Sequence, residues 1–266
     1  MIGDQERVAI VTGAARGIGA ATARALAEDG WRLVLVDVCA DDPALTYALA
    51  TPAELDAVVA ACGGADRAIG VVGDVRDQAA LDGAVATAED RFGQLDAAVA
   101  AAGCVAGGLP AWATGEDVWT TMMDVNFGGV RRLVQAAVPA LLRGDPHGRR
   151  IVAVSSMGGA VGLPLLSAYV AAKHAVNGLI RSLAAELGPH GITANAVAPG
   201  STVTAMLAAS ATVYELPDVE GLIEGHLLGR ALEPAEVAAL VAWVCGPHSS
   251  GMTGAILPVD AGATSR

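Results

Sequence analysis

Short apolar runs that alternate with longer helical stretches constrain the fold of this 266-residue chain more than any other feature. A strand that is apolar on both faces needs cover on both faces, and parallel strands need long crossover connections. The alternation therefore predicts an α/β fold with a doubly wound, seven-stranded parallel sheet and helices on both faces. We expect strands at residues 8–11, 33–36, 69–72, 97–101, 151–154, 192–197 and 255–259. We expect helices at residues 17–28, 78–92, 115–142, 168–187 and 234–244.

Two segments are longer than this alternation needs. Residues 39–64 form an insertion after the second strand, with a helix expected at 52–61, and residues 202–229 are expected to form a substrate lid. Long excursions at the carboxyl ends of parallel strands are where such sheets place binding loops. The alternative for each is a surface insertion without function. Because no repeat or low-complexity linker divides the sequence, we expect a single domain over residues 1–266.

A glycine-rich turn, residues 12–19 (TGAARGIG), lies between the first strand and the first helix. Glycines permit a tight turn and a close backbone approach, and the free N–H groups at the start of a helix attract a negatively charged pyrophosphate. Asp37 ends the second strand about 20 residues downstream, where a carboxylate accepts hydrogen bonds from ribose hydroxyls. This context predicts a Rossmann-type dinucleotide site that includes Gly13, Arg16, Gly17, Ile18, Gly19 and Asp37.

The same residues bear on the choice between NAD and NADP. Asp37 would repel a 2′-phosphate, whereas the Arg16 guanidinium could hold one. Because a buried contact between like charges is costly and Arg16 can swing away or pair with Asp37, we expect NAD. Asp74 and Val75, just past the third strand, are expected beside the adenine ring. For Asp74 the alternative is a helix N-cap.

Tyr169 and Lys173 are four residues apart in an expected helix and so share one face of it. A neighbouring ammonium favours the phenolate form of a tyrosine, which makes the phenol an acid or base near neutral pH. Ser156 follows the fifth strand, and its hydroxyl could share a substrate oxygen with the phenol. Asn126 lies inside an expected helix, where asparagine is unfavourable, which indicates a functional role. The alternatives are a surface Tyr–Lys pair and an internal hydrogen bond for Asn126.

Together these residues make the chain resemble the short-chain dehydrogenase/reductase family over essentially its whole length. The family's TGxxxGxG motif matches residues 12–19. Its tetrad of Asn, Ser, Tyr and Lys falls on Asn126, Ser156, Tyr169 and Lys173. Its PGxxxT motif, whose threonine contacts the nicotinamide carboxamide, matches residues 199–204.

One family motif is altered. The family usually has NNAG after the fourth strand, and residues 100–103 here are AAAG, so the asparagine side-chain bonds are missing. We expect a local packing change, while backbone contacts to the cofactor survive. The further cofactor contacts implied by the resemblance are Ala102, Gly103, Tyr169, Lys173, Pro199, Gly200, Thr202 and Thr204.

The resemblance implies reversible oxidation of a secondary alcohol to a ketone, with hydride transfer to NAD. Tyr169, as phenolate, would remove the hydroxyl proton, and Ser156 would bind the substrate oxygen. Lys173 would lower the pKa of Tyr169 and bind the nicotinamide ribose, and Asn126 would hold a water that relays the proton. Without Arg or Lys to clamp an acid, the expected pocket predicts an uncharged apolar substrate. Its residues, for which lid packing is the alternative, are Leu109, Trp112, residues 161–166, Met206, Leu207 and Tyr214.

A finer resemblance concerns the insertion. Its sequence, from CADDPAL to ELDAVVAACGG, is similar to that of actinobacterial dehydrogenases associated with mycofactocin. In that subfamily the insertion is thought to cover a tightly held NAD, which mycofactocin reoxidises in place. An ordinary reductase with exchanging cofactor is one alternative. A noncatalytic NAD-binding regulator on the same fold is another.

Composition excludes several classes of protein. A formal net charge of −12 at pH 7 provides no basic surface for nucleic acid. The chain starts with acidic residues before its first apolar run, unlike a signal peptide, and no run reaches the ~20 apolar residues of a membrane helix, so we expect a cytoplasmic protein. The four cysteines and five histidines have no metal-site spacing, and we expect no metal. The family resemblance implies a homotetramer in which the helices carrying Asn126 and Tyr169 pack between subunits.

Overall fold

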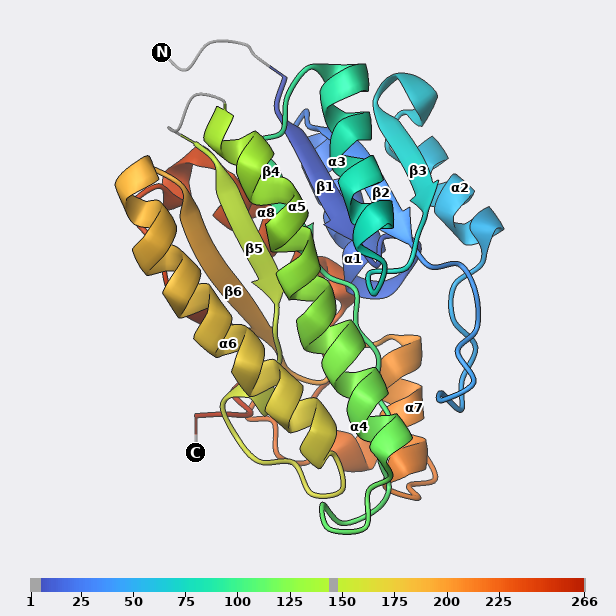
Figure 1. Cartoon of the computed structure of the whole chain (residues 1–266). Coiled ribbons are helices and arrows are strands. Elements are labelled where there is room, and N and C mark those ends of the chain that lie inside the picture. Colours follow the sequence, from blue (N-terminus) through green and yellow to red (C-terminus); the bar gives the residue numbers. More distant parts are fainter. Residues whose placement is uncertain (1–5, 144–147, 266) are drawn as a thin grey trace.

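Seven parallel strands form one sheet in the order β3-β2-β1-β4-β5-β6-β7, which confirms the predicted fold class (Figure 1). The computed structural model describes residues 6–143 and 148–265, so the N-terminal residues 1–5 and His147, one of the five histidines, lie outside the described residues. The strands are β1 (Val8–Thr12), β2 (Arg32–Asp37), β3 (Ala68–Val72), β4 (Ala97–Ala100), β5 (Arg150–Val154), β6 (Thr193–Pro199) and β7 (Ile256–Val259).

The sheet changes its winding direction between β1 and β4. Thr12, the last residue of β1, pairs with Val36 of β2 on one side and with Ala100 of β4 on the other. The loops after these three strands therefore leave the same edge of the sheet. Open α/β sheets bind their ligands in the crevice outside the carboxyl ends of the strands at such a switch point.

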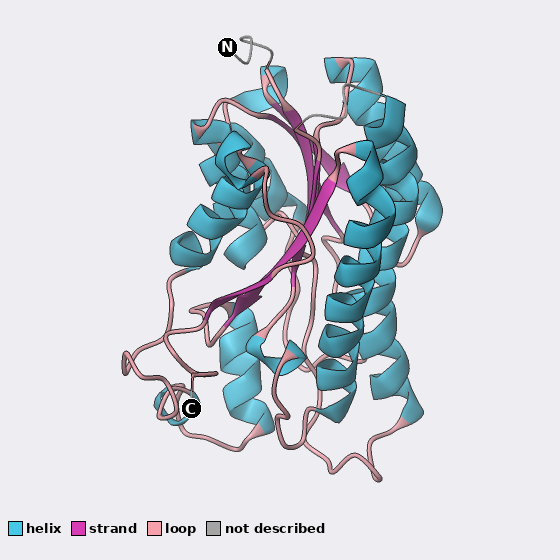
Figure 2. Cartoon of the chain, turned by 90° about the vertical axis from the view of Figure 1, so that its left-hand side faces the viewer, coloured by secondary structure: helices cyan, strands magenta, loops and turns pink. Residues whose placement is uncertain are grey.

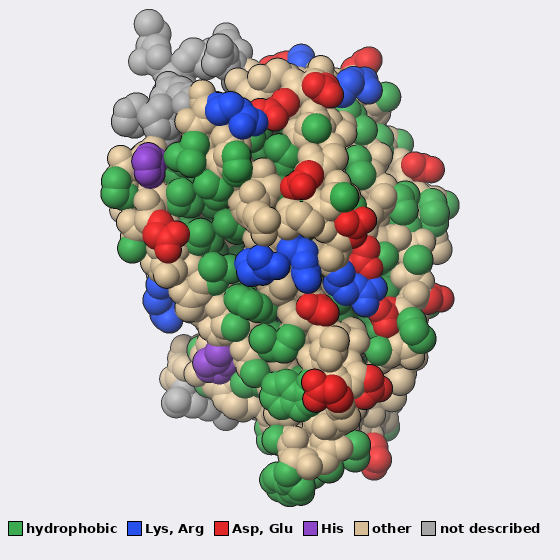
Figure 3. All heavy atoms as spheres, viewed as in Figure 1, with side chains coloured by type: hydrophobic (Ala, Val, Ile, Leu, Met, Phe, Trp, Pro, Cys, Tyr) green, Lys and Arg blue, Asp and Glu red, His purple; other side chains and the backbone are tan. Residues whose placement is uncertain are grey.

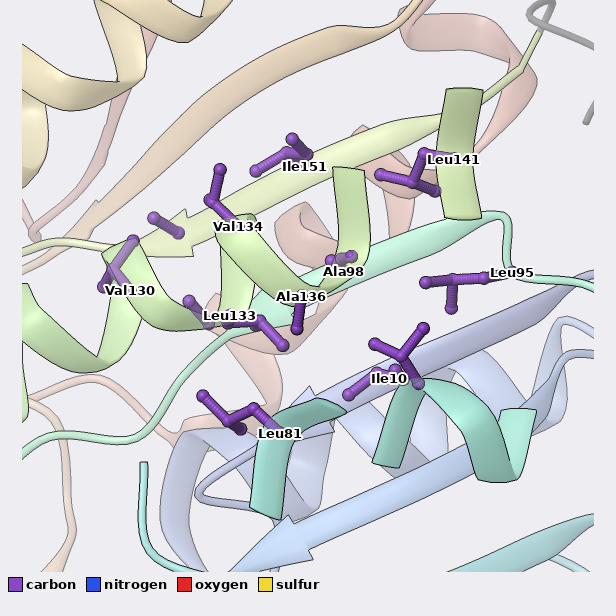
Figure 4. Packing of buried hydrophobic residues seen from close by; sticks show 14 of the residues in the cluster. Ile10, Leu81, Leu95, Ala98, Val130, Leu133, Val134, Ala136, Leu141 and Ile151 are labelled. Carbon is purple, nitrogen blue, oxygen red and sulfur yellow. The ribbon is translucent and has the colours of Figure 1, made fainter. Parts of the chain in front are cut away.

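Helices cover both faces of the sheet, as strands without a polar face require (Figure 2). On one face of the sheet, buried side chains such as Ile10, Leu133 and Ile151 pack together (Figure 4). Burying each such side chain contributes roughly 1.5–3 kcal/mol. One layer consists of α3 (Gln78–Phe92), α5 (Gly129–Arg143) and α6 (Ser167–Leu187), and the other of α1 (Gly17–Glu28), α2 (Pro52–Ala61) and α8 (Pro234–Cys245).

The helix predicted at residues 115–142 is interrupted. It begins as α4 (Glu116–Met123), passes through a π-helical turn at Asp124–Gly128, and continues as α5. A π turn spaces its hydrogen bonds five residues apart instead of four, which widens the helix locally. The prediction of one regular helix was therefore wrong around Asn126, and such turns are frequent at functional sites.

Both long excursions begin at the edge of the sheet where the carboxyl ends of the strands lie. We call residues 39–50 the strap; α2 follows it over the predicted residues and begins at a capping box in which Thr51 and Glu54 bond reciprocally. We call residues 202–229 the lid. The lid contains α7 (Ala205–Val213), whose first turn is capped by the Thr204 hydroxyl.

Among the described residues, no helix is long and apolar enough to cross a lipid bilayer. The same part of the chain brings together no group of three or more His, Cys, Asp or Glu side chains that could hold a metal ion. The four cysteines are free thiols, and three of them are buried.

Candidate active site

The turn after β1 lies against the loop after β4 with no room for a side chain between them. Gly13 has a φ of +67°, and a Cβ atom there would lie 2.6 Å from the Cα atom of Ala102. A Cβ atom at Gly19 would lie 2.0 Å from the Gly13 carbonyl oxygen. Only glycine fits at these two positions. No side chain caps the start of α1, so its first N–H groups stay available to an anion.

Thr12 holds the loop of the altered AAAG motif. Its hydroxyl oxygen accepts hydrogen bonds from the N–H groups of Ala101 at 3.2 Å and Ala102 at 3.3 Å. These bonds tie the end of β1 to the loop after β4. The backbone of this loop is therefore held by a side chain of β1.

Asp37 lies beside the glycine turn, as predicted. It is buried at the end of β2, and one of its carboxylate oxygens accepts a hydrogen bond from the Ala15 N–H at 2.9 Å. Arg16 points to the strap, where its guanidinium donates to the carbonyl of Ala48. The guanidinium is thus engaged away from the carboxylate, which was one of the two arrangements considered for Arg16.

Ser156, Tyr169 and Lys173 come together at the same carboxyl-end edge of the sheet, away from the glycine turn. The Ser156 hydroxyl and the Tyr169 ring lie against the same piece of backbone, because a Cβ atom built at Gly158 would lie 3.4 Å from each of them. The Ser156 hydroxyl also accepts from the Gly158 N–H at 3.0 Å, which orients it. The Lys173 ammonium lies 5.7 Å from the centre of the Tyr169 ring and donates to the Val154 carbonyl at 2.9 Å. All three side chains are buried, which excludes a surface Tyr–Lys pair.

Burial controls the protonation of this group. It raises the pKa of the Tyr169 phenol, and the hydrogen bond with Ser156 opposes the rise. It also lowers the pKa of Lys173 to about 8. We expected Lys173 to lower the pKa of Tyr169, whereas the net pKa of Tyr169 is raised. The physical reason is that the phenol is desolvated while the ammonium is bonded to the Val154 carbonyl.

Asn126 is fully buried inside the π turn. Its amide nitrogen donates to the carbonyls of Cys104 at 3.0 Å and Met122 at 3.1 Å, and its amide oxygen accepts from the Cys104 N–H at 3.2 Å. The internal hydrogen bond considered as the alternative is thus present. The side chain fixes the loop after β4 beside Lys173, because a Cβ atom at Gly103 would lie 2.9 Å from the Asn126 amide oxygen and 3.7 Å from the Lys173 nitrogen.

Asp74 has a partner that the sequence did not reveal. Arg76 donates to its carboxylate through Nε and Nη2 at 2.6–3.1 Å, and a third nitrogen of Arg76 reaches Asp42 of the strap at 2.7 Å. Burial raises the pKa of Asp74, but the hydrogen bonds and charge of Arg76 outweigh it and the net pKa is lowered. The N-cap alternative was wrong, since Asp77 caps α3 by accepting from the Ala79 N–H.

A cavity of about 1030 Å³ runs along this edge of the sheet and joins the glycine turn to the group of Ser156, Tyr169 and Lys173. Every residue predicted to contact the cofactor lines it, and so does Ser156; Asn126 does not. At the substrate end the predicted lining residues that take part are Leu163, Pro164, Leu166, Met206, Leu207 and Tyr214.

Part of the predicted substrate pocket was wrong. Leu109 and Trp112 are 53% and 90% exposed and do not line the cavity, because their loop folds back locally with the Ala113 N–H bonded to the Pro110 carbonyl. Val161, Gly162 and Leu165 are also outside it. Sequence reasoning missed four further lining residues, which are Leu45, Tyr47, Cys104 and Val105. The available signal was the pair of apolar residues in the strap, Leu45 and Tyr47.

Comparisons with known proteins agree with this geometry. A family model described as enoyl-(acyl carrier protein) reductase matches residues 13–264. The chain is 40% identical to the short-chain reductase protein NovJ of Streptomyces niveus, over 97% of this chain and 94% of that protein. It is 36% identical to (-)-trans-carveol dehydrogenase of Rhodococcus erythropolis, over 97% of each.

A solved structure matches equally widely. The crystal structure of carveol dehydrogenase from Mycobacterium avium in complex with NAD has a TM-score of 0.91 and 35% identity to this chain, over 98% of each. Likeness of this extent covers the sheet, the glycine turn and the buried Ser–Tyr–Lys group together. The chain therefore belongs to the short-chain dehydrogenase/reductase family of oxidoreductases.

Proposed function

We propose that this chain is an NAD-dependent enzyme that interconverts a secondary alcohol and its ketone. The observation that carries the proposal is that one cavity joins the glycine turn to the buried group of Ser156, Tyr169 and Lys173. The likeness to a carveol dehydrogenase with bound NAD supports it. A noncatalytic NAD-binding regulator would need the turn, but it would not need a buried phenol beside a buried serine and a buried lysine.

The residues of the cavity fit NAD. The uncapped start of α1 would hold the pyrophosphate, and Asp37 would accept from the ribose hydroxyls and repel the 2′-phosphate of NADP. Asp74 and Val75 would flank the adenine, while Lys173 and Thr204 would hold the nicotinamide end. Bound NAD supplies the acceptor for the hydride that leaves the alcohol carbon.

The protein's own side chains handle the proton. Tyr169 as phenolate takes the hydroxyl proton, and Ser156 donates to the substrate oxygen as its charge changes. Lys173 supplies positive charge nearby. Because the hydrogen-bonding groups of the Asn126 side chain already bond the chain itself, its part would be to fix the loop after β4 beside Lys173.

Alcohol oxidation should become faster as the pH rises from 7 to 9, and ketone reduction should become slower. Burial raises the pKa of Tyr169, so the protonated phenol that serves reduction dominates at neutral pH, and the phenolate that serves oxidation increases with pH. Above about pH 8 the rise should flatten as Lys173, with a pKa of about 8, loses its charge. The measurement is kcat in both directions from pH 6 to 10. An oxidation rate that falls over this range would contradict the assignment.

We also propose that the strap retains NAD, so that mycofactocin reoxidises the cofactor in place. Two contacts hold the strap across the cofactor end of the cavity: Arg16 to the Ala48 carbonyl, and Arg76 to Asp42. Arg76 is itself fixed by Asp74 on the opposite side. The similarity of the insertion to mycofactocin-associated dehydrogenases supports this proposal.

Mass spectrometry of the small molecules released on denaturation distinguishes a retained cofactor from an exchanging one. The purified protein, with no cofactor added, should release nearly one NAD or NADH per chain. Turnover should then depend on an artificial electron acceptor instead of free NAD. An empty protein that turns over with free NAD would identify an ordinary exchanging reductase.

The substitution Asp42→Asn should make NAD dissociate about three to ten times faster, because it weakens a partly exposed, charge-assisted contact of the strap. The matched control is Glu89→Gln, which weakens the exposed ion pair with Arg143, remote from the cavity. Dissociation is followed as loss of NAD during dialysis. Equal retention by both variants would show that this contact does not close the strap.

We propose an uncharged substrate and a homotetramer. Within the lining at the substrate end, Lys173 is the cation, and the remaining side chains there are largely apolar.

The face formed by α4, α5 and α6 carries hydrophobic side chains among charges of both signs, as Figure 3 shows, and this face would pack between subunits. Light scattering should then give about four times the chain mass of 26.5 kDa. A monomer at micromolar concentration would contradict the assembly.

A further inference from the structure

The strap extends past the cofactor end and reaches the substrate end of the cavity through Tyr47. The Tyr47 hydroxyl oxygen accepts a hydrogen bond from the Val105 N–H at 3.0 Å. Its ring packs in an apolar cluster that also contains Leu166, Tyr169 and Tyr214. Tyr47 therefore lines the same chamber as the reacting phenol, although it comes from the insertion.

The hydroxyl of Tyr47 still has a proton to donate. The Val105 N–H occupies an acceptor position of the oxygen, and among the described residues no protein group accepts the hydroxyl proton. Burial raises the pKa of Tyr47 to about 12, against the opposing hydrogen bond from Val105, so the phenol stays neutral at working pH. Tyr214 differs, because its hydroxyl already donates to the Pro164 carbonyl at 2.8 Å.

A donor of this kind is a polar point in a largely apolar wall. A half-buried hydroxyl in such a wall discriminates between ligands, because a purely hydrocarbon ligand that covers it leaves the hydroxyl without a partner. A ligand that presents an oxygen at this point satisfies it. The bond from Val105 fixes the Tyr47 oxygen in place, which limits the entropy lost when such a ligand binds.

We propose that Tyr47 is a specificity residue that donates a hydrogen bond to a second oxygen of the substrate. This inference rests on the proposed function and narrows its substrate class. The substrate would be a secondary alcohol or ketone whose carbon skeleton carries another uncharged acceptor, such as a carbonyl or hydroxyl group, in addition to the oxygen held by Tyr169 and Ser156.

Matched alcohols test the proposal on the NAD-loaded enzyme with an artificial electron acceptor. Cyclohexanol is compared with 3-hydroxycyclohexanone and 4-hydroxycyclohexanone, which add one acceptor to the same ring. The parent enzyme should prefer an alcohol with two oxygens. In Tyr47→Phe the ratio of kcat/KM for that alcohol over cyclohexanol should fall about tenfold, through the loss of one neutral hydrogen bond. An unchanged ratio would overturn the proposal.

Tyr214→Phe is the matched control. It removes a hydroxyl from the same cluster, but one whose proton is bonded to Pro164, so the ratio should fall far less than in Tyr47→Phe. The NAD content of Tyr47→Phe should equal that of the parent, because Arg16 and Arg76 still hold the strap. Loss of NAD from Tyr47→Phe would assign Tyr47 to strap closure and refute a role in specificity.

Calorimetry separates failure of this inference from failure of the proposed function. Cyclohexanone and 1,4-cyclohexanedione are titrated into NAD-loaded parent enzyme and Tyr47→Phe without turnover. If no alcohol is oxidised, the proposed function fails, yet a preference for the dione that disappears in Tyr47→Phe still supports Tyr47 as the donor. If the parent enzyme binds neither ketone, or binds both equally well, Tyr47 does not donate a hydrogen bond to a second substrate oxygen.

Discussion

Replacing Tyr169 by phenylalanine should lower the rate of alcohol oxidation about a thousandfold or more, while NAD stays bound. The phenol is the group that takes the proton, and positioned acid–base groups contribute roughly 10²–10⁴-fold to rate. Phenylalanine keeps the ring in its apolar cluster and removes only the hydroxyl. The measurements are single-turnover oxidation and the NAD content of the purified variant.

The control for this variant is again Tyr214→Phe, which removes a hydroxyl from a second ring of the same cluster. Its loss of rate should be far smaller, because the Tyr214 hydroxyl bonds the Pro164 carbonyl and does not face a reacting oxygen in the mechanism. Normal turnover by Tyr169→Phe would refute the acid–base assignment. An equal, large loss in both variants would point to packing of the cluster instead of proton transfer.

Gly13→Ala should destabilise the protein by about 3 kcal/mol and abolish NAD retention. A Cβ atom at Gly13 would lie 2.6 Å from the Cα atom of Ala102 and 2.7 Å from its nitrogen, so the backbone of one loop must move. Overpacking of this kind costs roughly 1–3 kcal/mol, and the left-handed conformation, with a φ of +67°, adds about 1–2 kcal/mol. Urea unfolding and the released NAD measure the two effects.

Gly30→Ala isolates the close approach from the conformational cost. Gly30 also has a positive φ, of +84°, but no atom lies within 4 Å of the position its Cβ would take. The variant Gly30→Ala should lose only about 1–2 kcal/mol of its free energy of unfolding and should keep its NAD. If the two variants are equally stable and equally loaded, the contact between the glycine turn and the loop after β4 is not what shapes the cofactor site.

Much of this architecture could be predicted from local patterns. Runs such as residues 8–11 are apolar along their whole length, which demands helices on both faces and so determines the class of fold. The i, i+4 spacing of Tyr169 and Lys173 determines that they share a helix face. The glycine turn could also be assigned, because its position between a strand and a helix restricts what it can bind.

Contacts between distant segments decided the rest. Tyr47 meets Val105 across 58 residues of sequence, and Arg76 reaches Asp42 across 34, so no local pattern places the strap over the cavity. The bonds from Asn126 to Cys104 likewise span 22 residues and engage a side chain that was expected to hold a water. Periodicity specifies helices and strands through their own backbone geometry, whereas irregular segments take their course from the partners they meet. The sequence by itself thus determined the fold class and indicated the candidate reacting groups, and the tertiary structure decided which side chains enclose them.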